Sequence, residues 1–424
     1  MNILIYPAAS EIAREVFESL KDNKDLNLIG GTSSDFDKSH FIGYEKILNI
    51  PFISNDPKSD FVKNIFNILL ENKIDYIFPC HDDVSLVLSE LLPDKVLSHN
   101  YHINEICRYK NLTYDFLQNT GLIPSINPKT YPRFVKPKNS NGSKGAELIN
   151  NEDELKSYYT KYDKNNTIEL EYLPGDEYTI DCFSQNGCLL FSGSRQRNTS
   201  KMGISELSVG VNDKEIDEIA EIINDEFIKK GGLDGAWFFQ LKKDINNEYK
   251  LLEVGPRVSG GMSFYRMRGI NFSALTILTK QNNRELKIQD NNIKNLKFSK
   301  FFIPKYKYDK IDYDNIYVDF DDTLYLHKCK RMNIDLIKLL YQGINEGKRV
   351  ILITRSKNDF RTILNIYKMG YIWDEIIHIT DNTPKHEFIR SKSVFIDDAF
   401  SERNFSKENV YCFDVDNFNI LING

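Results

Sequence analysis

The stretch from Arg133 to Leu148, RFVKPKNSNGSKGAEL, decides how the rest of the chain is interpreted. It predicts a short apolar strand that ends near Lys136, a loop rich in glycine, serine and lysine, and a return strand that closes a hairpin. Glycine lacks a Cβ, so such a loop can lay its amide N–H groups on phosphate oxygens. The alternative is an ordinary turn with solvated lysines. The loop residues assigned to phosphate binding are Gly142, Ser143, Lys144 and Gly145.

The composition narrows the classes of protein that need to be considered. A chain of 424 residues with 41% hydrophobic residues predicts two or three globular domains. The net charge of −6, with acids and bases intermixed, gives no footprint for nucleic acid. The 6 cysteines include no CxxC pair, which is typical of reduced thiols. No segment approaches the roughly 20 apolar residues of a membrane helix, so we expect a cytoplasmic protein without a membrane partner.

Residues 1–100 alternate between apolar strands and amphipathic helices, which predicts a parallel sheet covered on both sides. Ser10 is expected to cap the first helix. Because no GxGxxG motif follows the first strand, dinucleotide binding is not expected. His81, Asp82 and Asp83 follow a strand end, where a substrate could bind. The favoured alternative is a helix N-cap with acidic first-turn residues.

Two later blocks give the hairpin its context. They are TIELEYLPGDEYTID from Thr167 to Asp181 and LLEVGPRVSGGM from Leu251 to Met262. In this order and at these separations, the three blocks resemble the ATP-grasp superfamily, especially members similar to the half-units of carbamoyl phosphate synthetase. The resemblance implies an α/β pre-ATP-grasp domain over residues 1–100, an α+β ATP-grasp domain over residues 101–303, and the cofactors ATP and Mg²⁺.

The resemblance also assigns the nucleotide contacts. Lys110 matches the first of two ATP-binding lysines and is expected to reach the α-phosphate, and Lys136 is expected to reach the α- and β-phosphates. Lys110 lies on a predicted helix that ends at Gly121. An acidic strand-turn-strand without any ligand is the alternative for the second block. The residues expected beside the adenine and the ribose are Glu171, Tyr172, Leu173 and Glu177.

Gln240 and Glu253 lie on consecutive predicted strands, which makes them neighbours in a hairpin. Two oxygen ligands so placed suit an Mg²⁺ ion that bridges phosphates. The family usually shows Glu-x-Asn-Pro-Arg, but here Gly255 stands at the asparagine position. Either water replaces the amide oxygen, or a second metal is weakly bound, or the site has drifted from efficient catalysis. The remaining matches are Arg257, assigned to catalysis at the transferred phosphoryl group, and Ser259, Gly260 and Gly261, assigned to the acceptor.

Arg195 and Arg197 lie on one face if their segment is extended, because side chains alternate with a period of two. Two guanidinium groups on one face suit a substrate carboxylate or phosphate. The alternative is a pair of surface arginines bound to acids.

A second catalytic domain is predicted over residues 316–424, after a charged and tyrosine-rich linker over residues 304–315. Acids and hydroxyls cluster at the ends of its predicted parallel strands, where doubly wound sheets place their sites. The pattern resembles the haloacid dehalogenase superfamily, over residues 314–424. The segments between the motifs leave no room for a cap domain, so we expect a capless Rossmann-like fold with an open site. The motif residues are Asp319, Asp321, Thr354, Lys385, Asp397 and Asp398.

The spacing of these residues suits phosphate hydrolysis. Asp319 would attack phosphorus, and Asp321 would protonate the leaving oxygen and then activate water. Crowded acids repel one another unless a cation is present, so Mg²⁺ is expected between Asp319, the Asp321 carbonyl and Asp397 or Asp398. Thr354 and Lys385, the latter at the start of a predicted helix, would hold phosphate oxygens. An acidic rim without catalysis is the alternative.

Together these patterns predict a bifunctional α/β enzyme: an ATP-dependent carboxylate-amine ligase acting through an acyl phosphate, fused to a Mg²⁺-dependent phosphatase. Its partners would be a small-molecule carboxylate, an amine and a phosphorylated substrate, with a homodimer left open. One alternative for the first part is an ATP-grasp kinase. Another is a nucleotide-binding module that regulates the phosphatase.

Overall fold

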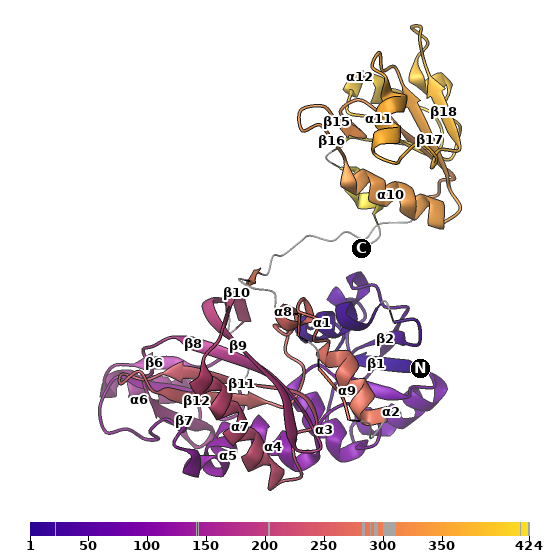
Figure 1. The fold of residues 1–424 in the computed structure, drawn as a ribbon. Helices are drawn as coiled ribbons and strands as arrows, with labels where there is room; N and C mark the ends of the chain where they lie inside the picture. The colour runs from indigo at the N-terminus through magenta and orange to yellow at the C-terminus, as the bar shows by residue number, and fades with distance from the viewer. Residues whose placement is uncertain are drawn as a thin grey trace. The chain divides into compact units, whose positions relative to one another are not determined.

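The chain divides into two compact units, Met1–Ile303 and Pro304–Gly424, which are described separately. The computed structural model describes the chain apart from residues 22, 141, 143, 202–203, 282–284, 289, 292–295, 300–310, 416 and 423–424, and apart from the side chains of 199–201, 204–206 and 420 (Figure 1). Ser143 and most of the expected linker therefore lie outside the described residues. Within the described part, no helix is both long and apolar enough to cross a membrane.

The first unit begins with the parallel sheet that the alternation predicts. Its strand order is β3-β2-β1-β4. Ser10 caps α1 as expected, because its hydroxyl accepts a hydrogen bond from the Ala13 amide at 3.0 Å. The short edge strand β3 was not predicted. The elements are β1 (Asn2–Tyr6), α1 (Glu11–Leu20), β2 (Asn27–Thr32), β3 (Lys46–Asn49), α2 (Asp60–Glu71), β4 (Tyr76–Pro79) and α3 (Asp82–Leu91).

A small antiparallel sheet of order β6-β5-β7 carries the predicted hairpin. The single helix expected around Lys110 is two helices, because Tyr109 between them has an extended backbone (φ −105°, ψ 110°). Gly121 ends the following turn in the left-handed conformation, with φ +75°. The elements are α4 (Tyr101–Arg108), α5 (Lys110–Phe116), β5 (Arg133–Pro137), β6 (Glu147–Ile149), α6 (Glu152–Lys161) and β7 (Thr167–Glu171).

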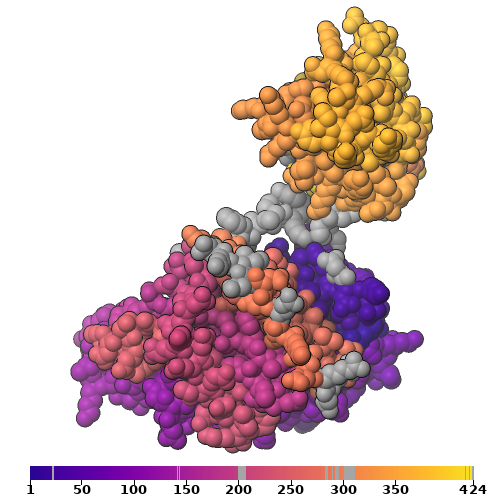
Figure 2. Space-filling view, viewed as in Figure 1, coloured from indigo at the N-terminus to yellow at the C-terminus, as the bar shows by residue number. Residues whose placement is uncertain are grey.

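A six-stranded sheet of order β12-β11-β8-β9-β10-β13 forms the centre of the unit. Along β11, Trp237 and Phe239 pack into one core with α7, whereas Ala236 and Phe238 pack into the other with α1 and α9. The elements are β8 (Glu177–Gln185), β9 (Cys188–Lys201), β10 (Ile204–Val211), α7 (Lys214–Ile228), β11 (Gly235–Lys243), β12 (Tyr249–Gly255), α8 (Ser263–Arg266), α9 (Phe272–Gln281) and β13 (Lys297–Ser299). Figure 2 shows the orange segment that contains α8 and α9 against the indigo N-terminal segment.

The second unit is a five-stranded parallel sheet of order β18-β17-β14-β19-β20 with apolar cores on both faces. The expected helix from Asn333 is present, with the Asn333 side chain as its cap. The prediction of a helix that begins at Lys385 is wrong, because only a short 3₁₀ turn, η4 (Lys385–Glu387), forms there. The other elements are β14 (Asn315–Val318), β15 (Tyr325–Leu326), β16 (Arg331–Met332), α10 (Ile334–Asn345), β17 (Arg349–Thr354), α11 (Phe360–Ile366), β18 (Glu375–His378), β19 (Ser393–Ile396), α12 (Phe400–Arg403) and β20 (Val410–Phe413).

Because each unit has its own cores, a cavity in one should leave the other folded. Leu352 in β17 is fully buried in the second unit, so Leu352→Ala should lower the free energy of unfolding of that unit by about 2–5 kcal/mol. Ile366→Ala, at a residue that is 66% exposed, is the control and should change the free energy of unfolding by less than about 0.5 kcal/mol. Hydrogen exchange should show lost protection in β14 and β17 but not in β11. Equal losses in both units would contradict the expectation.

Candidate active sites

Two buried lysine amines lie near Glu253 of β12 in the first unit. Lys136 Nζ donates to Tyr114 Oη at 3.1 Å and to the Leu252 carbonyl at 3.4 Å. Burial lowers the pKa of Lys136 to about 8, against the opposing charges of Glu253 and Glu177. Burial also lowers the pKa of Lys110, again against Glu253. Both cations lie in the field of Glu253. The further acids near them, Glu177 and Asp82, are each paired with an arginine, so the described residues leave spare positive charge for an anion.

The glycine loop is attached to α4 and α5 through its carbonyl groups. Lys110 Nζ donates to the Ser140 carbonyl at 2.6 Å, and Arg108 donates to the Asn139 carbonyl. Gly142 and Gly145 have φ of +62° and +74°, and a Cβ on Gly145 would lie 2.9 Å from Pro137 Cγ. The left-handed backbone favours glycine at both turns, and the contact with Pro137 adds a steric reason at Gly145. The assigned Lys144 is exposed.

Gln240 and Glu253 are directly opposite each other on the antiparallel strands β11 and β12. Both are half-buried, and among the described residues neither side chain makes a hydrogen bond. An amide oxygen and a carboxylate with free lone pairs, next to buried lysines, fit a hard divalent cation that is also bound to phosphate. This is the observation that fits Mg²⁺ to the site.

Gly255 has a structural reason to be glycine. A Cβ at this position would lie 2.2 Å from Phe238 Cε1, so the asparagine usual in the family cannot be placed here without moving the Phe238 ring. The ring of Phe238 also lies under the Arg257 guanidinium, with its centroid 5.3 Å from Cζ. The departure from the family motif is therefore coupled to packing against Phe238.

Arg257 is held by a bidentate ion pair to Asp82, at 2.5 and 3.2 Å. Burial disfavours both charges, but the pairing raises the pKa of Arg257 and lowers that of Asp82 to about 2. His81 caps α3, accepting from the Asp83 amide at 3.3 Å, and Asp83 pairs with Arg108 at 2.5 Å. The cap interpretation of residues 81–83 is thus confirmed, and Asp82 and Asp83 bind Arg257 and Arg108.

Arg195 and Arg197 are paired with acids, as the alternative proposed, although at buried rather than surface positions. Arg195 binds Asp181 at 2.8 Å, and Arg197 binds Glu177 at 2.7 Å. Ser259 Oγ also donates to Asp181 at 3.0 Å. Arg195 therefore supports the turn that contains Ser259, and its contact with a substrate stays a prediction.

The other assigned residues of this site have local structural contacts. A Cβ on Gly260 would lie 2.6 Å from Glu11 Oε1, and one on Gly261 would lie 2.1 Å from Arg195 Nη2. Glu171 accepts a hydrogen bond from the Ser125 amide at 2.7 Å. Of the other two residues expected beside the adenine, Leu173 is buried and Tyr172 is 37% exposed.

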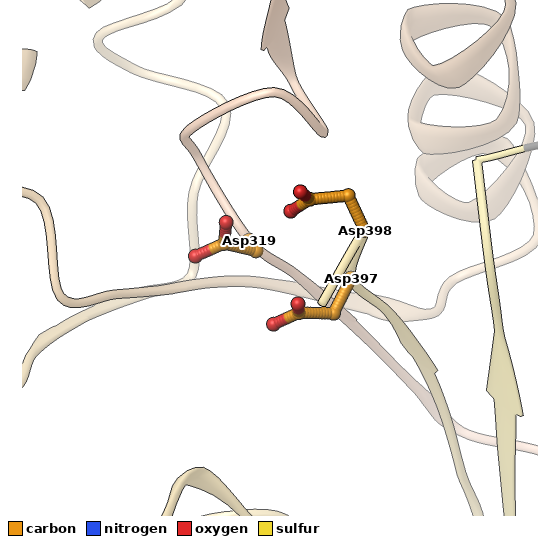
Figure 3. A group of neighbouring side chains, drawn as sticks. All are labelled: Asp319, Asp397 and Asp398. Carbon is orange, nitrogen blue, oxygen red and sulfur yellow. The ribbon is translucent and has the colours of Figure 1, made fainter. Parts of the chain in front are cut away.

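In the second unit, the ends of two adjacent strands bring acids together. Asp319 follows β14, and Asp397 and Asp398 follow β19. Each of the three offers one carboxylate oxygen, and these oxygens lie within 4.8 Å of one another (Figure 3). Lys385 Nζ donates at 2.6 Å to both Asp319 Oδ1 and Asp397 Oδ2. Although its predicted helix is absent, Lys385 thus reaches the predicted acids.

The charges of this cluster do not balance. Burial raises the pKa of Asp319 to about 7, with Asp397 adding to the rise and Lys385 opposing it. Burial likewise raises the pKa of Asp397. One lysine, bound to two of the three clustered carboxylates, leaves negative charge in excess, so the carboxylate oxygens fit a divalent cation. The Thr354 hydroxyl, also buried, accepts from the Ser356 amide at 3.0 Å.

Three side-chain pairings in these sites were not predicted from the sequence. Thr323 Oγ1 donates to Asp398 Oδ1 at 3.1 Å and accepts from the Asp398 amide at 2.9 Å. His327 Nε2 lies 2.6 Å from Asp321 Oδ1. Tyr114 Oη, beside Lys136, donates to the Leu252 carbonyl at 3.0 Å. Polar or aromatic character alone gave no signal for these pairings, although Thr323 and His327 stand close to the acidic motif.

Comparison with known proteins identifies the fold of the first unit. Residues 163–299 match the family model described as ATP-grasp in the biosynthetic pathway with Ter operon. The biotin carboxylase domain of Hydrogenobacter thermophilus 2-oxoglutarate carboxylase matches with a TM-score of 0.57 at 13% identity, over 69% of this chain and 72% of that chain. The chain contains an ATP-grasp fold. No curated protein sequence matches it.

Two further structural neighbours are named as a ligase and a synthetase. The L-amino acid ligase from Bacillus licheniformis has a TM-score of 0.52 at 19% identity, over 66% of this chain and 74% of that chain. The N5-carboxyaminoimidazole synthetase from Staphylococcus aureus, complexed with ADP, has a TM-score of 0.54 at 15% identity, over 68% and 79%. At these identities the likeness concerns the ATP-grasp fold alone. The family model ends at residue 299, so the second unit is interpreted from its own geometry.

Mg²⁺ should stabilise the second unit more at pH 8 than at pH 5. With a pKa of about 7, Asp319 is protonated at pH 5 in the folded, metal-free protein but ionised in the unfolded chain. The folded state then binds more protons, so the free energy of unfolding falls as the pH rises through this window. A cation binds the ionised form of Asp319. The increase in the free energy of unfolding that Mg²⁺ causes should therefore grow from pH 5 to pH 8, to about 2.7 kcal/mol at 100 times its Kd.

Calorimetry with and without Mg²⁺ measures this difference. Asp319→Asn is the matched variant, because it removes the titrating group and should flatten the pH dependence. A Mg²⁺ effect of equal size at both pH values in the unmodified chain would contradict the assignment of Asp319 to the cation site.

Proposed function

We propose that the ATP-grasp unit is an ATP-dependent carboxylate-amine ligase that activates a small carboxylate as an acyl phosphate. The observation that carries the proposal is the pair Gln240 and Glu253, whose side-chain oxygens accept no hydrogen bond from the residues that the structure describes and lie beside two buried lysines. The amino acid ligase and the N5-carboxyaminoimidazole synthetase among the neighbours support the same reaction class. The names of the neighbours solved with MgADP or ADP support ATP and Mg²⁺ as cofactors.

Each residue has a defined task in this proposal. Gln240 and Glu253 would hold Mg²⁺, which neutralises phosphate charge when bound. Lys136 and Lys110 exchange their present carbonyl and hydroxyl acceptors for phosphate oxygens, which favours their charged forms. Arg257, fixed by Asp82, lies at the end of β12, where it can bind the transferred phosphoryl group. The carboxylate becomes an electrophile once its oxygen is phosphorylated, and the amine then displaces phosphate.

The alternatives differ in their products. A kinase would release ADP with a stable phosphorylated product. A regulatory module would bind MgATP without substrate-dependent ADP release. Gly255, which removes one oxygen ligand usual in the family, is the observation that favours the regulatory alternative.

Lys136→Ala and Glu253→Ala should each reduce substrate-dependent ADP release by about 30- to 1000-fold, because a charged phosphate or metal contact is lost in the transition state. ADP release across a panel of carboxylate and amine pairs is the measurement. Lys156→Ala, at an exposed lysine of α6, is the matched control and should retain full activity. If MgATP fails to raise the unfolding temperature of the unmodified protein, the nucleotide assignment is wrong.

We infer that the second unit is a Mg²⁺-dependent phosphatase similar to the haloacid dehalogenases. The cluster of Asp319, Asp397 and Asp398, two of which bind Lys385, supports this function. An Asp319 oxygen attacks phosphorus while the bond to the leaving oxygen breaks, and Asp321 supplies the proton to that oxygen. Water then attacks the aspartyl phosphate, returns a proton to Asp321, and releases inorganic phosphate. Lys385 and Thr354 would hold the phosphoryl oxygens.

Asp319→Asn should abolish hydrolysis of an aryl phosphate, since the amide is not a nucleophile and removes a ligand charge. Asp321→Asn should keep the nucleophile but hydrolyse the aspartyl phosphate slowly, so acid quenching should trap phosphorylated protein only in this variant. Full activity of Asp319→Asn, after repurification to exclude contaminating phosphatases, would leave the cluster as a metal-binding site without catalysis.

A further inference from the structure

We propose that His327 is a positioning residue that orients the Asp321 carboxyl group for proton transfer, and this inference rests on the proposed phosphatase function. His327 Nε2 lies 2.6 Å from Asp321 Oδ1, which is a short contact for a nitrogen and an oxygen. The two side chains are about one-third exposed, at 35% and 33%. They are therefore accessible to solvent rather than buried in the core.

The backbone around the motif delivers His327 to this position. Asp322 adopts φ +51°, and its amide donates to the Tyr325 carbonyl at 2.8 Å. The Tyr325 amide returns a hydrogen bond to the Phe320 carbonyl at 2.8 Å, so the chain reverses directly after the catalytic acids. The reversal leads into the hairpin of β15 and β16, which starts with Tyr325.

Two further contacts fix the histidine itself. The His327 amide donates to Asp322 Oδ1 at 3.0 Å. The His327 ring meets the Tyr325 ring edge-on, with centroids 5.0 Å apart. The imidazole is thus held from its backbone and from its ring, and Nε2 points at Asp321. A surface ion pair without such supports would contribute little, because its side chains are free to separate.

The hydrogen bond selects which oxygen of Asp321 carries the mobile proton. When Nε2–H donates to Oδ1, the proton of the carboxyl group resides on Oδ2. In the first step this proton moves from Oδ2 to the leaving oxygen as the P–O bond breaks. In the second step the attacking water returns a proton to Oδ2, and phosphate leaves Asp319. His327 gains and loses no proton in this cycle; it restricts the rotation of the carboxyl group.

The test compares leaving groups, because a general acid matters most when the leaving oxygen is basic. We would measure kcat/KM of the full chain with Mg²⁺ for phenyl phosphate and for 2,4-dinitrophenyl phosphate, since kcat/KM includes departure of the leaving group. His327→Phe keeps the ring contact with Tyr325 but cannot donate. His327→Gln keeps an N–H donor. Lys328→Ala, at the exposed neighbour in the same segment, is the control.

We expect His327→Phe to lower kcat/KM about 10- to 100-fold for phenyl phosphate and less than about 3-fold for 2,4-dinitrophenyl phosphate. His327→Gln should recover part of the loss, and Lys328→Ala should behave like the unmodified chain. Equal losses on both substrates in both His327 variants would show a merely structural role and overturn the inference, as would unchanged kinetics in His327→Phe. If the unmodified chain hydrolyses neither substrate, the phosphatase function itself fails and the inference with it.

Discussion

The ion pair between Arg257 and Asp82 fixes the site of the ATP-grasp unit. It joins the segment after β12 to the first turn of α3, two places separated by 175 residues in the sequence. The same segment is held from its other side by Ser259, which donates to the buried Asp181. A second bidentate pair, between Arg266 and Glu15 at 2.8 and 3.1 Å, joins α8 to α1. Removing one partner of such a pair leaves an uncompensated charge, so these contacts specify one arrangement of the N-terminal sheet on the ATP-grasp part.

The sequence predicted the elements of the site better than their connections. Parallel strands, the hairpin around Lys136 and the opposition of Gln240 and Glu253 all follow from short-range periodicity and turn chemistry, and the structure has them. Periodicity also predicted a helix through Tyr109, where two helices meet, because the pattern of apolar side chains continues across the break. The 3₁₀ turn at Lys385 has a similar cause: Pro384 suits a helix start, but only one turn is formed.

The partners of charged side chains were the least predictable feature. The sequence predicted on which face of its strand Arg195 lies, but not which acid it binds. Its partner, Asp181, lies on the neighbouring strand, and the register of β8 and β9 brings the two together. His327 reaches Asp321 only because the chain reverses at Asp322, whose positive φ carries no unambiguous sequence signal. Long-range pairing thus depends on register and on single backbone conformations, which the spacing of residues in the sequence does not determine.

The two sites are built with opposite imbalances of charge. In the ATP-grasp unit, Lys110 and Lys136 are buried beside Glu253, while the nearby Glu177 and Asp82 are paired with arginines, so the site favours an anion. In the second unit, Lys385 is paired with two of three clustered carboxylates, so the site favours a cation. Burying unbalanced charge costs folding free energy, and the rise in the pKa of Asp319 is the measurable form of that cost. A ligand that supplies the missing charge recovers this free energy on binding, so the same groups that weaken the empty site provide its affinity.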